Sequence, residues 1–120
     1  MVSAAPPVRA TAPSVKAMRL DAAGKSELML LSGPPETVTM RSGLITLEPG
    51  KSVGRHSTNG NEEIVVVLRG KGEMRFWNGH PPVPMEGGMA VYGPPDTEHD
   101  VVNTGTEPLQ YVFVVARAAK

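Results

Sequence analysis

The chain contains no cysteine among its 120 residues. Disulfides, thiolate metal ligands and cysteine nucleophiles are therefore all excluded. An excess of charge of either sign is also lacking, because 12 basic and 12 acidic residues cancel and no segment concentrates Lys and Arg. The electrostatic footprint of a protein that binds nucleic acid or an anionic membrane is thus missing. We expect the partner to be a small molecule, with no nucleic acid and no membrane involved.

Long hydrophobic runs are absent as well. No segment approaches the roughly 18 consecutive apolar residues of a membrane span, and the stretch from Met1 to Pro13 is rich in Ala and Pro without the apolar core of a signal peptide. These absences predict a soluble protein, and the cytoplasm is its expected location. Residues 1–15 should form a flexible N-terminal arm, and residues 16–120 a single domain large enough to bury a core without crosslinks.

Helical periodicity is scarce, and short β-like runs alternate with turn residues instead. The chain has 13 glycines and 12 prolines, which punctuate it often. Regular short strands between such breakers predict an all-β antiparallel sandwich or barrel with essentially no helix. The expected runs are residues 27–31, 37–47, 62–68, 73–77, 89–92, 99–102 and 109–115.

The composition of individual runs predicts their place in a sheet. Residues 64–68 and 111–115 are apolar at every position, which is typical of central strands covered on both faces. Asn78-Gly79 predicts a hairpin whose returning strand, at 81–84, carries three prolines. Proline cannot donate a ladder hydrogen bond, so this strand belongs at an edge.

Asn59-Gly60 is the strongest local signal, because this pair favours a two-residue type I′ hairpin turn. Such a hairpin would set His56 directly opposite Glu63, on one face of the sheet and with Cβ atoms roughly 5 Å apart. Val65 shares the side of Glu63, so this face is the apolar interior. A buried imidazole beside a buried carboxylate indicates either a hydrogen-bonded pair or a shared metal ion.

Two spaced motifs extend this local signal over residues 50–103. In the first, a glycine is followed after five residues by a histidine, and a glutamate is followed after six residues by a glycine. In the second, a glycine precedes a proline, a histidine and an asparagine. The chain resembles the small single-domain members of the cupin family in both motifs. The matching residues are Gly50, His56, Glu63 and Gly70, then Gly88, Pro94, His99 and Asn103.

The resemblance implies a cupin-type jelly-roll barrel (double-stranded β-helix) with a divalent metal ion held by His56, Glu63 and His99. Thr58 stands where the family has its second histidine, and Asp96 where it has a turn glycine. Two imidazoles and a carboxylate leave coordination positions open, as in non-haem iron sites, but they also accept Mn, Zn, Ni or Cu, so the metal stays open. Glu63 and Thr58 are the candidate catalytic residues, with the Thr58 hydroxyl holding a metal-bound water.

The sequence is compatible with two functions. The first is a metal-dependent enzyme with dioxygenase-like or isomerase-like chemistry on a small organic molecule; the second is a non-catalytic module that binds or senses a small molecule or a metal. His80 is expected in an exposed loop, and the alternative is an extra ligand. Tyr92 is expected to pack in the sheet, and the alternative is a place in the pocket wall. Exposed sheet edges and the resemblance to small cupins suggest a homodimer formed by strand addition.

Overall fold

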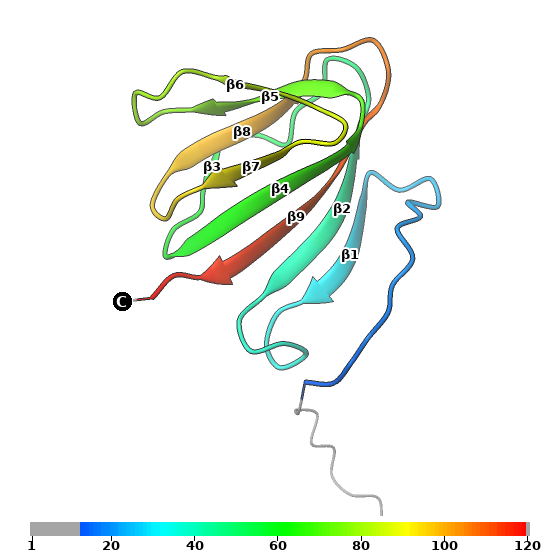
Figure 1. Ribbon diagram of the computed structural model, residues 1–120, viewed down its shortest axis with the longest axis vertical. Helices are drawn as coiled ribbons and strands as arrows, with labels where there is room; N and C mark the ends of the chain where they lie inside the picture. Colours follow the sequence, from blue (N-terminus) through cyan, green and yellow to red (C-terminus); the bar gives the residue numbers. More distant parts are fainter. Residues whose placement is uncertain (1–12, 120) are drawn as a thin grey trace, which may run out of the picture.

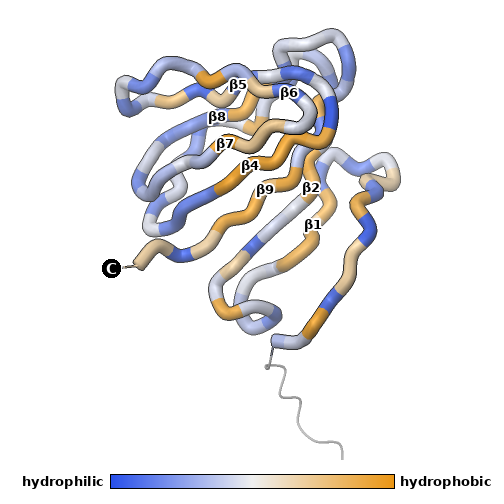
Figure 2. The backbone as a smooth tube through the Cα atoms, in the orientation of Figure 1, coloured by the Kyte–Doolittle hydropathy of each residue, from blue (hydrophilic) through white to orange (hydrophobic). Residues whose placement is uncertain are grey.

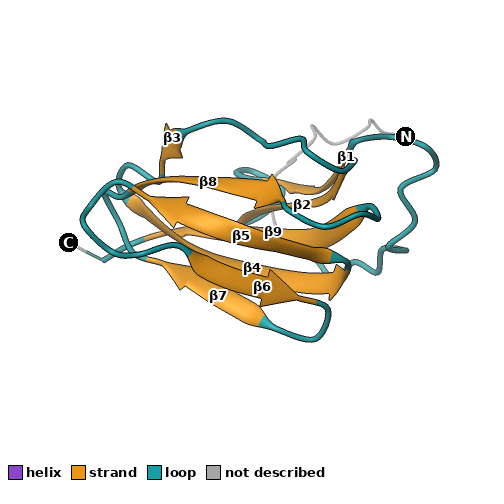
Figure 3. Ribbon diagram, turned by 90° about the horizontal axis from the view of Figure 1, so that it is seen from above, coloured by secondary structure: helices purple, strands orange, loops and turns teal. Residues whose placement is uncertain are grey.

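The computed structural model describes residues 13–119, and in this range the chain forms nine strands and no helix (Figures 1 and 3). The all-β prediction is therefore confirmed. No helix that could cross a membrane is found in the described range. The expected flexible arm lies almost wholly outside the described residues, and the division at residue 16 stays a prediction. The strands are β1 (Glu27–Ser32), β2 (Arg41–Leu47), β3 (His56–Ser57), β4 (Asn61–Arg69), β5 (Lys71–Phe76), β6 (Val83–Glu86), β7 (Ala90–Gly93), β8 (Glu98–Asn103) and β9 (Leu109–Arg117).

The strands form two antiparallel sheets. The larger sheet has the order β1-β2-β9-β4-β7 and the smaller the order β3-β8-β5-β6 (Figure 1). Strands distant in sequence are thus neighbours, as β2 and β9 are, which closes the chain on itself. The two inner faces enclose a core of aliphatic, methionine and aromatic side chains, and long hydrophobic segments run along β4 and β9 (Figure 2).

Period-two alternation on β4 decides which side chains reach the core. Val65 and Val67 are almost completely buried, and Glu63 keeps only 9% of its surface exposed on the same inner face. Ile64 and Leu68 on the outer face are each 39% exposed. The central position predicted for this strand is confirmed, since it lies between β9 and β7. The prediction that both faces are covered is wrong for β4, because its outer apolar side chains contact solvent within the single chain.

The Asn59-Gly60 turn does not close the predicted hairpin. Asn61 N donates to Thr58 O at 3.0 Å, so a turn forms, but only Asn59 has a positive φ (53°), whereas a type I′ turn needs it at both central residues. The flanking strands also separate: β3 pairs with β8, and β4 pairs with β7 and β9. The turn carries the chain from one sheet to the other. His56 is therefore not a ladder partner of Glu63.

The second predicted hairpin does form. β5 pairs with β6 on either side of the loop that contains Asn78-Gly79, and β6 is the last strand of the smaller sheet. The edge position predicted from its prolines is confirmed. The edge strands of the larger sheet are β1 and β7, and those of the smaller sheet are β3 and β6. These edges are the surfaces on which strand addition would occur, and the homodimer stays a prediction.

Gly70 lies at the corner where the chain leaves the larger sheet at the end of β4 and enters the smaller sheet at β5. Its φ is +89°, in the region that side chains other than glycine rarely adopt. A Cβ at this position would meet Pro108 O at 2.4 Å. The corner therefore needs glycine for two reasons, its backbone conformation and the close approach of the loop before β9.

We predict that Gly70→Ala destabilises the protein by about 2–4 kcal/mol, because it adds a steric clash to the cost of a positive φ. Gly79→Ala is the matched control, since Gly79 has a similar φ of +93° but no atom within 4 Å of a built Cβ. It should cost only about 1–2 kcal/mol. Urea denaturation of the variants measures both values. Equal losses would show that the contact with Pro108 contributes nothing.

Candidate metal site

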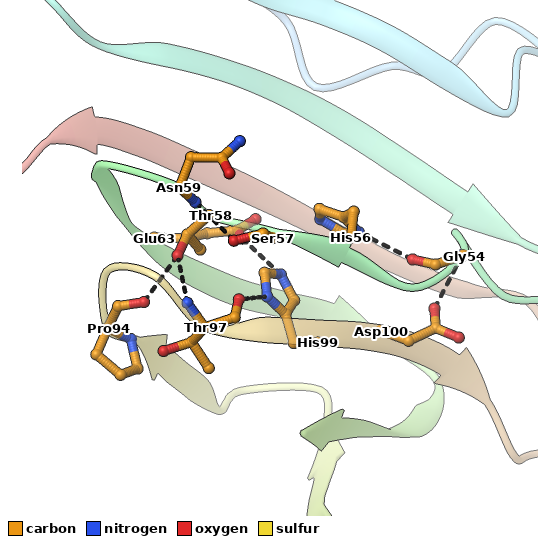
Figure 4. A network of polar contacts seen from close by, with 10 residues as sticks. All are labelled: Gly54, His56, Ser57, Thr58, Asn59, Glu63, Pro94, Thr97, His99 and Asp100. Atoms are coloured by element: carbon orange, nitrogen blue, oxygen red, sulfur yellow. Dashed lines mark hydrogen bonds and ion pairs between the residues drawn. The ribbon is translucent and has the colours of Figure 1, made fainter. Parts of the chain in front are cut away.

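Three side chains that could bind a metal converge at the mouth of the barrel. His56 on β3 and His99 on β8 are direct partners in the smaller sheet. Glu63 reaches them from β4 in the larger sheet. One donor atom from each residue lies within 4.8 Å of the others (Figure 4). The three predicted ligand positions therefore meet, although they meet across two sheets and not across a hairpin.

His99 and Glu63 form a buried ion pair. His99 Nε2 lies 2.8 Å from Glu63 Oε1, and the His99 side chain is 1% exposed. Burial lowers the pKa of His99, but the hydrogen bond and charge of Glu63, with smaller contributions from Thr97 O and Asp100, outweigh it and raise the pKa above 6.5. Without a metal, the His99 imidazole therefore holds its proton more tightly than a free histidine does. An ion at Nε2 would take the place of that proton.

Both histidines are oriented by the same local device. His56 Nδ1 lies 2.8 Å from Gly54 O, and His99 Nδ1 lies 3.3 Å from Thr97 O, in each case the carbonyl two residues earlier. A carbonyl only accepts, so Nδ1 carries the proton in both rings. Nε2 is left as the atom that can bind a metal. Orientation of a ligand histidine through its second nitrogen is a general feature of metal sites.

Asp100 holds the loop that orients His56. Its carboxylate accepts a hydrogen bond of 2.9 Å from Gly54 N, and Gly54 O in turn accepts from the His56 ring (Figure 4). Alternation along a strand predicts that Asp100, next to His99, faces away from it as a solvated carboxylate. Its contact with the loop corrects the second part of this prediction. No sequence signal indicates this contact, because it joins residues 46 positions apart.

His56 itself is exposed, whereas the predicted hairpin would have buried it in the apolar interior. The reason is that β3 is a two-residue edge strand at the barrel mouth. A cavity of about 270 Å³ opens beside the three residues. It also contains Arg41 and Tyr111, which the sequence analysis did not single out. Their position becomes visible only when the order of β2, β9 and β4 in the sheet is known.

Thr58 is buried close to the cluster and lines the same cavity. Its hydroxyl donates to Pro94 O at 2.9 Å and accepts from Thr97 N at 3.2 Å (Figure 4). The hydroxyl proton is thus used to join two loops, and in this arrangement none remains to donate to a bound water. A catalytic function of Thr58 stays a prediction, and the observed contacts favour a structural one.

The two other candidates from the sequence, His80 and Tyr92, lie outside the cluster. His80 is exposed, and its Nδ1 contacts Pro81 O at 2.7 Å, so the expectation of an exposed loop is confirmed. Tyr92 is 55% exposed and donates to Glu62 at 2.7 Å on the outer face of the larger sheet. It does not line the cavity. Within residues 13–119, the three ligand candidates form the single group of this kind.

The donor set fits a first-row divalent ion. Metal–nitrogen and metal–oxygen bonds of about 2.1 Å place neighbouring donors roughly 3 Å apart, which the His99–Glu63 distance of 2.8 Å already approaches. His56 can close the remaining gap because it lies on an exposed edge. Three protein ligands leave positions open for water or an organic ligand.

Comparison with known proteins agrees with this architecture. The sequence model of the cupin domain matches residues 43–115, which contain all three converging side chains. The chain belongs to the cupin family. Among solved cupins, a conserved barrel domain protein from Salinispora arenicola superimposes with a TM-score of 0.70, at 25% identity over 88% of this chain and 91% of that one. A cupin-like protein from Thermotoga maritima gives a TM-score of 0.68, at 24% identity over 75% and 66% of the two chains.

Two curated proteins share part of the cupin sequence. A glucose-6-phosphate isomerase from Pyrococcus abyssi is 39% identical in an alignment of 67 positions that covers 49% of this chain and 33% of that protein. An oxalate-binding protein from Thermotoga maritima is 33% identical over 69 residues, which are 58% of this chain and 55% of that protein. The matched segments thus span about a third and about half of these relatives.

We predict that Glu63→Gln lowers the pKa of His99 in metal-free protein, because an amide lacks the charge that favours the imidazolium. The folded-state pKa lies above the ordinary value of 6.5, so the ion pair stabilises most below about pH 6.5 and its contribution is lost as the pH rises through the folded-state pKa. The variant should lose about 1–3 kcal/mol at pH 6 and less at pH 9. An NMR titration of His99 and urea denaturation at both pH values, in EDTA, test this.

Glu62→Gln is the matched control for this experiment. Glu62 directly precedes Glu63 but lies on the outer face, where it accepts a hydrogen bond from Tyr92. It should leave the His99 titration unchanged. A stability loss for Glu63→Gln that is the same at pH 6 and pH 9 would contradict the ion pair.

Proposed function

We propose that this cupin binds a divalent transition metal through His56, Glu63 and His99 and uses the adjoining cavity for a small organic ligand. The observation that carries the proposal is the convergence of the three donors within 4.8 Å, with both imidazoles oriented through Nδ1 by backbone carbonyls. The two facing sheets of the barrel hold this arrangement from opposite sides. Iron, manganese, zinc, nickel and copper all suit two imidazoles and a carboxylate.

A bound ion would supply Lewis-acid or, for iron, redox chemistry to an oxygen-bearing ligand. The residues of this chain bind and orient that ligand in a cavity with both polar and apolar walls. One curated relative is named for an isomerase activity, which supports an enzyme, and the other is named for binding oxalate, which supports a binding module. We favour a metal-dependent enzyme with isomerase-like or dioxygenase-like chemistry. A non-catalytic binding module is the alternative, and the structural use of the Thr58 hydroxyl favours it.

Titration of the metal-free protein with Mn²⁺, measured by isothermal titration calorimetry, tests the site. We expect one ion per chain, and a loss of affinity of about 100-fold or more for His56→Ala, since removal of a ligand should exceed the 10–100-fold typical of its supporting residues. His56 is exposed, so this variant should fold. His80→Ala is the control, because His80 is exposed and outside the cluster. Equal affinity of the two variants would rule out the proposed site.

We also expect protein purified without added metal to retain a transition metal in amounts approaching one per chain. Elemental analysis identifies it: iron favours oxygenase chemistry, and zinc or manganese favours isomerase chemistry. Glu63→Gln then separates the two functions. Loss of metal together with turnover supports an enzyme, whereas ligand binding without turnover in the parent protein supports the module. Finding no transition metal in any preparation would contradict the proposal.

A further inference from the structure

The cavity is lined by polar side chains that the metal site does not use. Besides the three ligand candidates, its wall includes Arg41 from β2 and Tyr111 from β9. At about 270 Å³ it has room for about nine water-sized groups, so its ligand is small. These two side chains indicate what kind of ligand the cavity recognises.

Sheet register places Arg41 on the same inner face as Glu63. Arg41 is the partner of Val115, and Val115 is in turn the partner of Glu63. Directly paired residues share a face of the sheet, and two strand spacings separate the outer members of this row by about 10 Å. Arg41 therefore faces the metal-site glutamate across the cavity from two strands away.

The Arg41 side chain is exposed, and its guanidinium lies over an aromatic ring. Its central carbon lies 5.6 Å from the centroid of Phe113, within the range of a cation–π interaction. Gly43 makes room for this ring, since a Cβ there would come within 2.7 Å of it. Arg41 forms no ion pair with any acidic residue in the range 13–119. Its forked donors are thus positioned at the cavity and available to an anion.

Tyr111 supplies a second donor. Its side chain is 3% exposed, and its hydroxyl makes no hydrogen bond to another residue within the part of the chain described. Burial raises the pKa of this phenol well above its ordinary value, and the charges of Glu63, Asp100 and Glu27 raise it further. The hydroxyl thus keeps its proton. A buried donor without a partner is rare in folded proteins and needs an acceptor from outside the chain.

The charges around the cavity favour a ligand of low negative charge. A divalent ion would bring two positive charges and Arg41 one, whereas Glu63 and Glu27 remove two. One positive charge would remain. A carboxylate group matches the planar fork of a single arginine, and a short dicarboxylate can divide its two charges between Arg41 and the metal. A phosphate concentrates two charges on one group and is usually bound by several cations. The apolar wall, which includes Ile45 and Val53, fits a short carbon skeleton.

We propose that the cavity binds a small carboxylic acid whose carboxylate is held by the Arg41 fork, with the Tyr111 hydroxyl as a second donor to the ligand in the same cavity, beside the His56–Glu63–His99 cluster. The inference rests on the proposed function, because the other end of the ligand would face the metal. It makes Arg41 the residue that selects acids over neutral molecules of the same size. Tyr111 offers its single proton to another oxygen of the ligand.

Calorimetric titration with malonate tests this assignment, using metal-free protein and protein loaded with one equivalent of Mn²⁺. We expect binding in both states, tighter with the metal. Arg41→Met keeps an unbranched side chain against Phe113 and should weaken malonate binding about 30-fold or more, and Arg41→Lys should restore part of the loss. Arg69→Met removes the same charge at the far end of β4 and should change nothing. Malonamide, the neutral analogue, should not bind.

Tyr111→Phe gives a second, independent readout. It should weaken malonate binding about 3–10-fold, the usual value of one hydrogen bond. In the ligand-free protein it should leave the melting temperature unchanged or raise it, because it removes a buried hydroxyl without a partner. A fall of several degrees would show that the hydroxyl is already satisfied, for example by an enclosed water, and would overturn the assignment of Tyr111.

The remaining outcomes separate this inference from the metal site. If Arg41→Met binds malonate as tightly as the parent protein, or if malonamide or glycerol 3-phosphate binds as well as malonate, the carboxylate site is wrong while Mn²⁺ binding can still hold. Absence of malonate binding in both states would also overturn it. If Mn²⁺ does not bind but malonate binding still depends on Arg41, the metal site fails and the carboxylate site stands.

Discussion

A carboxylate and an imidazole can be buried at the end of an apolar barrel only if each satisfies the other. Glu63 and His99 do so at 2.8 Å, one from each sheet. Their pair links the two sheets at the mouth, where the apolar core ends and the cavity begins. The candidate metal site is this pair with a third donor, His56, brought in from the edge of the smaller sheet.

The site has a rigid half and an accessible half. His99 and Glu63 are buried and come from longer strands, whereas His56 lies in a two-residue strand whose ring is oriented through Gly54. Asp100 secures that loop from the neighbouring strand. A metal centre needs both properties, since fixed donors set its geometry and an exposed donor lets ion and ligand enter. Arg41 and Tyr111 extend the same cavity with donors that suit an anion.

Much of the fold was predictable from the sequence, and the reasons are local. Short apolar runs between glycine and proline turns predicted the all-β class, and the prolines at 81–84 predicted the edge position of β6, because each depends on a residue's own backbone chemistry. The resemblance to the cupin motifs implied the three converging side chains. The Asn59-Gly60 hairpin failed for the opposite reason: local turn preference was overridden by the pairing of β4 with β7 and β9, which buries Val65 and Val67.

The sequence by itself therefore determined the strands, the turns and the types of donor that reach the mouth. Only the tertiary structure decided that Glu63 meets the histidines across two sheets, that the Thr58 hydroxyl is used by Pro94 and Thr97, and that Arg41 faces the cavity. The physical reason is that alternation along a strand defines a face, but the strand order in the sheet defines which faces meet. That order arises from contacts between distant segments, which no local pattern records.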